Sequence, residues 1–352
     1  MGSKKQIIVG GVRIGGGAPV TVQSMTNTKT SDVRSTVAQI NRLAELGCDI
    51  ARVAVPDMES ADAIAEIKNH ISIPLVADIH FDHRLAIRAA EAGADKLRIN
   101  PGNIGGEDNV SRVADVCKKR GIPIRIGVNG GSLKKEILAK HGGLTPEAMC
   151  ESAEEHIRLL NRFDFDDICV SVKASDVRTT IEAYRLLSER MDYPLHLGLT
   201  EAGTEYRGLV KSSIGIGALL ADGIGDTIRV SLTAQPEREI PAGLAILRSL
   251  GLREGYELIS CPTCGRCRID LISMTQEVEE RLELLSRDIS VAVMGCAVNG
   301  PGEASRADYG IAGGDGEGLV FKKGVVLRKV PMDKLVDELF LAINEREHAK
   351  GL

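Results

Sequence analysis

Residues 32–55 read DVRSTVAQINRLAELGCDIARVAV and contain one complete helix-then-strand unit. Asp32 has the character of a helix N-cap and Gly47 that of a helix stop. Between them the apolar residues follow helical spacing: Val33, Val37, Ile40, Leu43 and Ala44. The run Ile50–Val55 is short, apolar and rich in β-branched residues, which is typical of a buried strand. The stretch therefore predicts a helix that leads directly into a strand.

The same alternation continues on both sides of this unit, up to about residue 232. The runs expected as strands are Val20–Ser24, Ile50–Val55, Pro74–Ile79, Lys96–Ile99, Pro123–Val128, Ile168–Lys173, Pro194–Leu199 and Thr227–Leu232. Helices are expected at Asp32–Gly47, Asp82–Ala92, Asp108–Arg120, Thr145–Arg162 and Asp176–Arg190. Alternating elements imply parallel strands, and eight units in about 250 residues are the count of a (β/α)8 TIM barrel. A doubly wound open sheet is the alternative, but no run carries a complete G-x-G-x-x-G fingerprint after a strand.

The pattern changes after residue 251, which predicts a barrel domain over residues 1–251 and a small α+β domain over 252–352. In the second part we expect a short strand before the first cysteine pair and a helix from about 270 to 285. A strand over Ile289–Met294, a hairpin that pairs Gly318–Phe321 with Val325–Val330, and a terminal helix from Asp333 follow.

Composition narrows the class of function. The net charge is −5, aromatic residues make up 3% and Trp is absent, so a nucleic-acid-binding protein is not expected. No stretch reaches the roughly 18 apolar residues of a membrane span. We expect a cytoplasmic protein with reduced thiols, in which clustered cysteines bind metal rather than form disulfides.

Basic residues recur inside the expected strands, where an unpaired buried charge is costly. They are Arg52, Arg98, Arg125, Lys173 and Arg229. The carboxylates expected near the same strand ends are Asp78 and Glu201, which leaves a surplus of three positive charges. An anionic ligand, most simply a diphosphate, would neutralise that surplus, with Asn129 and Ser231 as neutral donors. Glu201 is the preferred acid/base candidate, because it lies at a strand end beside this charge.

Four cysteines gather near the C-terminus, in CPTCGRC (261–267) and GCAVNGPGE (295–303). Three metal centres fit these residues. Zinc or a four-iron cluster could bind the four thiolates of Cys261, Cys264, Cys267 and Cys296. Alternatively, a cluster could bind Cys261, Cys264 and Cys296 with Glu303 as fourth ligand, since a carboxylate would leave one iron exchangeable.

Further motifs extend along nearly the whole chain: GGGAPVTVQSMTNT (15–28), ADIHF (77–81), RINPGN (98–103), RIGVN (125–129), SVKAS (171–175), LGLTEAG (197–203) and RVS (229–231). With the two cysteine motifs, they closely resemble the 4-hydroxy-3-methylbut-2-enyl diphosphate synthase family of the non-mevalonate isoprenoid pathway. The resemblance implies a TIM barrel followed by a reductase-like iron–sulfur domain. It also implies a [4Fe–4S] cluster on Cys261, Cys264, Cys296 and Glu303, with Cys267 outside the ligand set.

The resemblance implies an oxidoreductase for 2-C-methyl-D-erythritol 2,4-cyclodiphosphate. The reaction is a reductive ring opening and dehydration, with two electrons delivered through the cluster by flavodoxin or ferredoxin. A homodimer is implied as well. The expected catalytic residues are Glu201 and Glu303. The expected substrate-binding residues are Arg52, Asp78, Arg98, Arg125, Asn129, Lys173, Arg229, Ser231 and Asn299. The alternative is a TIM-barrel enzyme for a phosphorylated substrate with a structural zinc domain.

Overall fold

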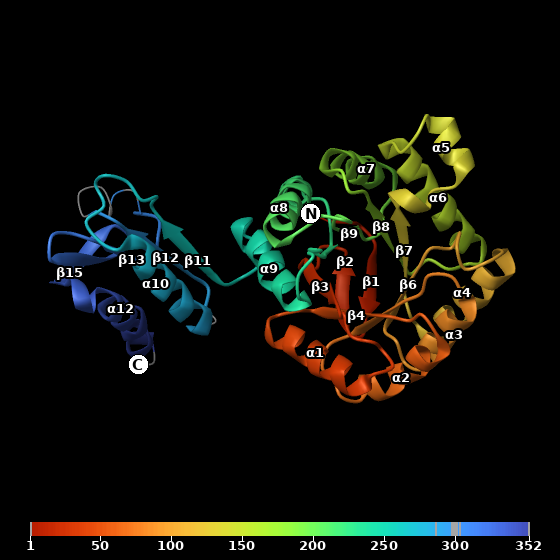
Figure 1. The fold of residues 1–352 in the computed structure, drawn as a ribbon, viewed down its shortest axis with the longest axis horizontal. Helices are drawn as coiled ribbons and strands as arrows, with labels where there is room; N and C mark the ends of the chain where they lie inside the picture. Colours follow the sequence, from red (N-terminus) through yellow and green to blue (C-terminus); the bar gives the residue numbers. More distant parts are fainter. Residues whose placement is uncertain (1, 286, 297–301, 303, 351–352) are drawn as a thin grey trace. The chain divides into compact units, whose positions relative to one another are not determined.

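A computed structural model of the chain describes residues 2–285, 287–296, 302 and 304–350. It divides into two compact units, Met1–Arg253 and Glu254–Leu352 (Figure 1). Each unit has its own hydrophobic core. None of the helices in the described part of the chain has the length and apolar character that crossing a bilayer requires.

The first unit contains an eight-stranded parallel sheet in the order β8-β7-β6-β5-β4-β3-β10-β9. A bridge from Val170 to Leu195 joins β8 to the segment before β9, so the sheet closes into a barrel. The strands are β3 (Thr21–Met25), β4 (Ile50–Ala54), β5 (Leu75–Asp78), β6 (Lys96–Ile99), β7 (Ile124–Asn129), β8 (Ile168–Lys173), β9 (His196–Leu197) and β10 (Thr227–Ile228). The predicted (β/α)8 barrel is confirmed.

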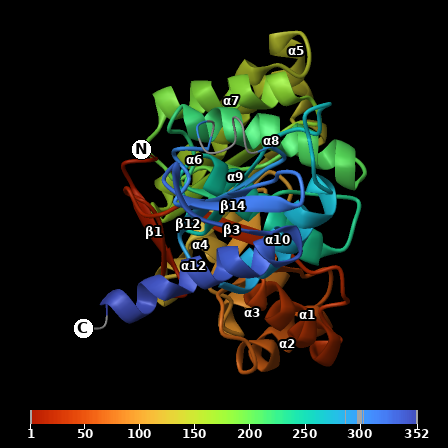
Figure 2. The same ribbon diagram turned by 90° about the vertical axis from the view of Figure 1, so that its left-hand side faces the viewer.

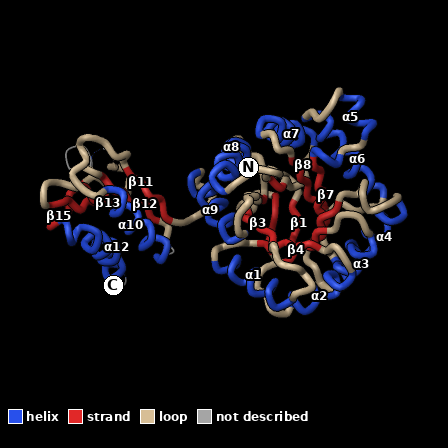
Figure 3. Tube along the Cα trace, in the orientation of Figure 1, coloured by secondary structure: helices blue, strands red, loops and turns tan. Residues whose placement is uncertain are grey.

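Helices surround the strands (Figure 3). They are α1 (Val33–Glu45), α2 (Met58–Lys68), α3 (His83–Glu91), α4 (Glu107–Arg120), α5 (Lys135–His141), α6 (Pro146–Arg162), α7 (Val177–Arg190), α8 (Glu205–Ala221) and α9 (Glu239–Ser249), with short 3₁₀ turns at Gly130–Ser132 and Pro236–Arg238. The Asp32 carboxylate accepts the Ser35 N–H at 3.1 Å, as expected of an N-cap. Ile40 and Leu43 of α1 belong to the buried layer between helices and strands.

A hairpin precedes the barrel and was not among the eight predicted strands. It pairs β1 (Gln6–Val9) with β2 (Val12–Gly15) through Gly10 and Gly11, whose φ angles of 53° and 92° suit glycine. Its side chains Ile7, Val9 and Ile14 form one cluster with Ile50, Val76 and Cys169 of the barrel strands. The hairpin thus packs against the amino ends of the strands and leaves the carboxyl ends open.

The second unit is a five-stranded sheet in the order β11-β12-β13-β14-β15. The first three strands are parallel and the last two antiparallel to their neighbours. The elements are β11 (Tyr256–Ser260), α10 (Leu271–Leu285), β12 (Ile289–Met294), β13 (Tyr309–Ala312), β14 (Glu317–Lys322), β15 (Val325–Pro331), a 3₁₀ turn at Met332–Lys334 and α12 (Leu335–Lys350). Helices α10 and α12 contact each other and the sheet (Figure 2).

Strand β13 (Tyr309–Ala312) was not among the strands predicted from the sequence. The strand is central in the sheet and contains Gly310. A Cβ atom at this position would lie 2.3 Å from the Phe321 ring on β14, so the glycine makes room for an aromatic side chain.

Candidate active site

The predicted cations gather at the carboxyl ends of the barrel strands. The parallel register places Asp78 of β5 beside Arg98 of β6, Arg98 beside Arg125 of β7, and Asn129 beside Lys173 of β8. Their alternate neighbours along each strand point outward into the apolar layer. The charged and polar side chains therefore face the barrel axis, at the end of the barrel where TIM-barrel proteins place their active sites.

These side chains surround a cavity of about 120 Å³, which we call the barrel cavity. It is lined by Arg52, Asp78, His80, Arg98, Arg125, Asn129, Ser171, Lys173, Leu199, Thr200, Arg229 and Ser231. All eight substrate-binding residues predicted within the barrel are among them. Ser171 was not predicted, although it lies two residues before Lys173 on the same face of β8, and this period-2 spacing was a usable signal.

The Asp78 carboxylate lines the barrel cavity. Its oxygens are 3.1 Å from Arg98 Nη1, 3.7 Å from Arg52 Nε and 3.4 Å from His80 Nε2. Burial by itself would raise the pKa of Asp78, but Arg52, His80 and Arg98 together hold the pKa well below its usual range. Asp78 is therefore ionised and fixes two of the cations in position.

Arg125 and Lys173 have no carboxylate partner among the described residues. Arg125 is 1% exposed, and its Nε and Nη1 atoms have no hydrogen-bond partner. The pKa of Lys173 is well below its ordinary value, first because the side chain is buried and then because Arg125, Arg52, Arg229 and Arg98 lie close to it. Buried donors without a partner are costly, so both side chains point to an anionic ligand in the barrel cavity.

Arg229 has a carboxylate partner that sequence reasoning missed. Its Nε lies 3.3 Å from Glu239 Oε2, at the first residue of α9. Arg229 and Arg52 also approach the sulfur of Met25 on β3, at 3.9 and 3.0 Å. With Asp78 and Glu239 as the two partner carboxylates, the five cations keep a formal surplus of three charges.

Glu201 lies apart from this group. The neighbouring Thr200 lines the barrel cavity, but Glu201 is exposed and does not. Its φ angle of 54° places a non-glycine residue in the left-handed region, which costs about 1–3 kcal/mol. Backbone strain of this kind recurs at functional sites. Glu201 therefore stays a candidate functional residue, although it does not line the barrel cavity.

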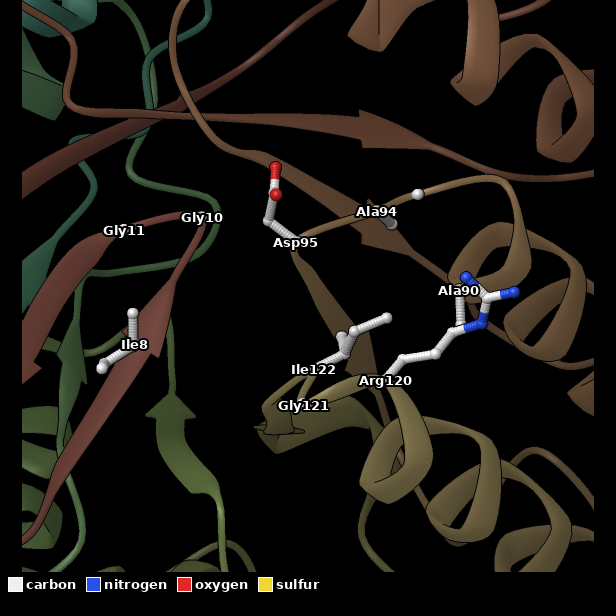
Figure 4. Close-up of a pocket in the computed structure, with 10 residues that line it drawn as sticks. Ile8, Gly10, Gly11, Ala90, Ala94, Asp95, Arg120, Gly121 and Ile122 are labelled. Carbon is white, nitrogen blue, oxygen red and sulfur yellow. The ribbon is translucent and has the colours of Figure 1, made fainter.

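A larger cavity, of about 710 Å³, lies at the other end of the barrel (Figure 4). Asp95 and Arg120 line it together with Ile8, Ala94 and Ile122, from the hairpin and from the ends of helices. The Asp95 carboxylate already accepts the Leu75 N–H at 2.7 Å and pairs with Lys68. None of the predicted site residues that the structure describes lines this cavity, and the Asp95 carboxylate stabilises the fold.

The cysteines of the second unit follow neighbouring parallel strands. Cys261 comes directly after β11 and Cys296 follows β12 by two residues. The Gly295 N–H donates to the Cys261 sulfur at 3.1 Å, which ties the two loops together. The backbone and side chain of Arg266 lower the pKa of the Cys264 thiol, which favours the thiolate that metal binding needs.

Cys267, like Cys261, packs against the core of the second unit. Its thiol donates to the Ile269 carbonyl at 3.3 Å, and a Cβ atom on Gly295 would lie 2.8 Å from its sulfur. Among the described residues, no three His, Cys, Asp or Glu side chains lie close enough to hold one metal ion. Glu303 and Asn299 lie outside the described residues. The soft thiol donors on one edge of the sheet suit an iron–sulfur cluster or zinc in their chemistry.

Fold and site together define a TIM-barrel protein with a cationic cavity, followed by a thiol-bearing α/β domain. The model of the GcpE TIM-barrel domain matches residues 4–244, and the model of the GcpE protein C-terminal domain matches residues 257–345. The chain belongs to the GcpE family.

Two curated relatives carry the name 4-hydroxy-3-methylbut-2-en-1-yl diphosphate synthase (flavodoxin). The protein from Caldanaerobacter subterraneus subsp. tengcongensis is 60% identical over 97% of this chain and 96% of its own length. The protein from Caldicellulosiruptor saccharolyticus is 61% identical over 96% of this chain and 98% of its own length. These matches span both units, including the cysteine-bearing one.

Solved structures with distant sequences share the barrel. Dihydropteroate synthase from Yersinia pestis has a TM-score of 0.51 and 12% identity, covering 71% of this chain and all of that one. The 3-dehydroquinate dehydratase from Geobacillus kaustophilus has a TM-score of 0.50 and 16% identity, covering 71% of this chain and 99% of that one. Identities this low speak for the fold alone.

Proposed function

We propose that this chain is a 4-hydroxy-3-methylbut-2-en-1-yl diphosphate synthase, an oxidoreductase of isoprenoid biosynthesis. It opens the ring of 2-C-methyl-D-erythritol 2,4-cyclodiphosphate reductively, takes up two electrons and releases water. The observation that carries this proposal is the barrel cavity, where five cations face two partner carboxylates. The formal surplus of three positive charges suits a diphosphate, and relatives about 60% identical bear this enzyme's name.

Each barrel residue has a part in holding the substrate. Arg52, Arg98, Arg125, Lys173 and Arg229 bind the diphosphate oxygens, with Asn129 and Ser231 as neutral donors. Asp78 holds Arg52 and Arg98 at fixed positions, so that their charges need no reorganisation when the ring opens. Glu201, on the loop after β9, supplies the proton for the hydroxyl that leaves as water.

The second unit provides the redox centre. Cys261, Cys264, Cys296 and Glu303 would hold a [4Fe–4S] cluster, Asn299 would take part in substrate binding, and Cys267 would stay outside the ligand set. When bound, such a cluster supplies single electrons and a Lewis-acidic iron. Electrons come from flavodoxin, which the relatives' names include, or from ferredoxin. The protein works in the cytoplasm as a homodimer.

The test is anaerobic turnover of the cyclic diphosphate with a chemical reductant. Arg98→Met should lower kcat/KM at least tenfold, because Arg98 loses both its charge and its contact with Asp78. Arg88→Met is the matched control: this arginine lies on α3 and pairs with Asp62 at the surface. Equal activity of the two variants would contradict the cavity assignment.

Iron and sulfide analysis of the same preparation tests the second unit. About four irons and four sulfides per chain, lost in Cys296→Ser, are expected for the cluster. One zinc without sulfide would instead favour the barrel enzyme with a structural zinc domain.

A further inference from the structure

Glu239 is a buried carboxylate that lies behind the barrel cavity. It is the first residue of α9, is 4% exposed, and is not among the residues that line the cavity. Buried carboxylates are rare unless paired and hydrogen-bonded, and this one is fully engaged. Its hydrogen-bond partners are Ser24 on β3, Arg229 directly after β10, and the backbone of Leu232.

Four donors converge on the two oxygens of Glu239. Oε2 accepts the Ser24 hydroxyl at 2.8 Å and Arg229 Nε at 3.3 Å. Oε1 accepts Arg229 Nη2 at 3.4 Å and the Leu232 N–H at 3.2 Å. The arginine is therefore gripped through two of its nitrogens, a geometry that fixes the plane of the guanidinium as well as its position.

The same carboxylate fixes more than Arg229. Leu232 directly follows Ser231, whose side chain lines the cavity, so the bond to its N–H holds the backbone that presents Ser231. Ser24 anchors Glu239 to β3, the strand that pairs with β10. One side chain thus joins two lining residues to the barrel wall.

We propose that Glu239 is a positioning residue, which orients Arg229 and the Ser231 segment toward the substrate without touching it. This inference rests on the function proposed above. Because Glu239 holds Arg229 through two of its nitrogens and the Ser231 segment through one backbone N–H, its removal should matter most while Arg229 is present, and only the smaller effect on the Ser231 segment should remain without it. An isosteric glutamine keeps the volume of the side chain, but its NH2 group cannot accept from Arg229, so one of the two contacts is lost.

The experiment is a double-mutant cycle in the turnover assay. Glu239→Gln should lower kcat/KM at least tenfold in the wild-type background and less than threefold in the Arg229→Ala background. Glu239→Asp keeps the charge but shortens the side chain, so a loss of similar size would assign the effect to geometry rather than to charge. Thermal unfolding of every variant checks that the barrel remains folded.

The matched control is Glu237→Gln, two residues earlier, whose carboxylate pairs with Arg42 outside the cavity. It should leave kcat/KM unchanged. Equal losses from Glu239→Gln in both backgrounds would overturn the inference, because the residue would then act independently of Arg229. Absence of turnover in the wild-type protein would instead contradict the proposed function.

Discussion

At the scale of single residues, Lys173 differs from the three arginines of the barrel cavity that have a carboxylate partner. Asp78 compensates Arg52 and Arg98, and Glu239 compensates Arg229. Lys173 has no carboxylate partner among the described residues and faces four arginines. Its pKa is lowered by burial first and by those arginines second, so the free protein disfavours its protonated form. A bound diphosphate would reverse both effects by supplying negative charge.

Binding of inorganic pyrophosphate should therefore be coupled to proton uptake by Lys173. Because the bound state holds more protons than the free state, affinity should fall as pH rises, by at most tenfold per pH unit. This fall in affinity is expected at pH values below the ordinary lysine pKa of 10.5. Calorimetric titration in two buffers of different ionisation enthalpy measures the uptake.

Pyrophosphate carries titrating protons of its own, so the decisive quantity is the difference between wild type and Lys173→Met. Lys134→Met is the control, since this lysine pairs with Glu155 at the surface. Identical proton uptake by wild type and Lys173→Met would rule out the assignment to Lys173.

Sequence reasoning anticipated the positions of the cavity residues that lie on strands, because charge inside an apolar strand is conspicuous. Arg52, Arg98, Arg125 and Lys173 were predicted on this ground, and all four line the barrel cavity. Glu239 was not predicted because it lies in the first turn of a helix, where carboxylates are common. Glu201 was expected beside the cations because it follows a strand end, but its side chain is exposed and does not line the barrel cavity.

At the scale of elements, two glycines of the barrel, one within a strand and one directly after a strand, make space for the cations. A Cβ atom on Gly127 of β7 would lie 2.3 Å from Arg98 Nε. A Cβ atom on Gly198, just after β9, would lie 2.6 Å from Lys173 Nζ. Glycine within a strand usually lowers the stability of that strand. At these positions it leaves the space that the cation side chains occupy beside the cavity.

Gly127→Ala should displace the Arg98 guanidinium while leaving β7 paired, because the φ angle here suits any residue. The contact between Arg98 and Asp78 would be lost, and pyrophosphate affinity should fall at least tenfold. Gly217→Ala on α8 is the control, as nothing lies within 4 Å of its added Cβ atom. A variant that binds pyrophosphate as tightly as wild type would show that Arg98 does not depend on this space.

Elements with a strong apolar period were predictable, and those defined by their neighbours were not. The helix expected at 32–47 appears as α1 (Val33–Glu45), since its N-cap and apolar face are both local signals. Strands β9 and β10 have only two paired residues each, where runs of six were expected. At Gly198, directly after β9, the backbone passes so close to the Arg229 carbonyl oxygen that a Cβ atom would lie 2.6 Å from it. Such close approach is a tertiary property that no local pattern records.

At the scale of the whole molecule, surplus positive charge is concentrated in the interior of one unit. Lys96 adds to it from the first residue of β6. The side chain is fully buried, its ammonium has no hydrogen-bond partner in the described part of the chain, and burial lowers its pKa to about 8. Concentrated like charge destabilises the folded barrel in the absence of an anion. The second unit has a separate core of apolar side chains, so an anion bound in the barrel cavity need not stabilise it.

Pyrophosphate should consequently slow amide hydrogen exchange in the barrel and leave the second unit unaffected. At a concentration 100 times its Kd, amides of β4, β6 and β7 that exchange through unfolding of the barrel should exchange about 100-fold more slowly. Amides of β11, β12 and β13 should exchange at the same rate as in sodium chloride of equal ionic strength. Mass spectrometry of the digested protein separates the two sets of strands. Equal protection of both units would mean that the anion stabilises the whole chain rather than the barrel alone. If neither unit were protected, the prediction that the barrel cavity binds pyrophosphate would be wrong.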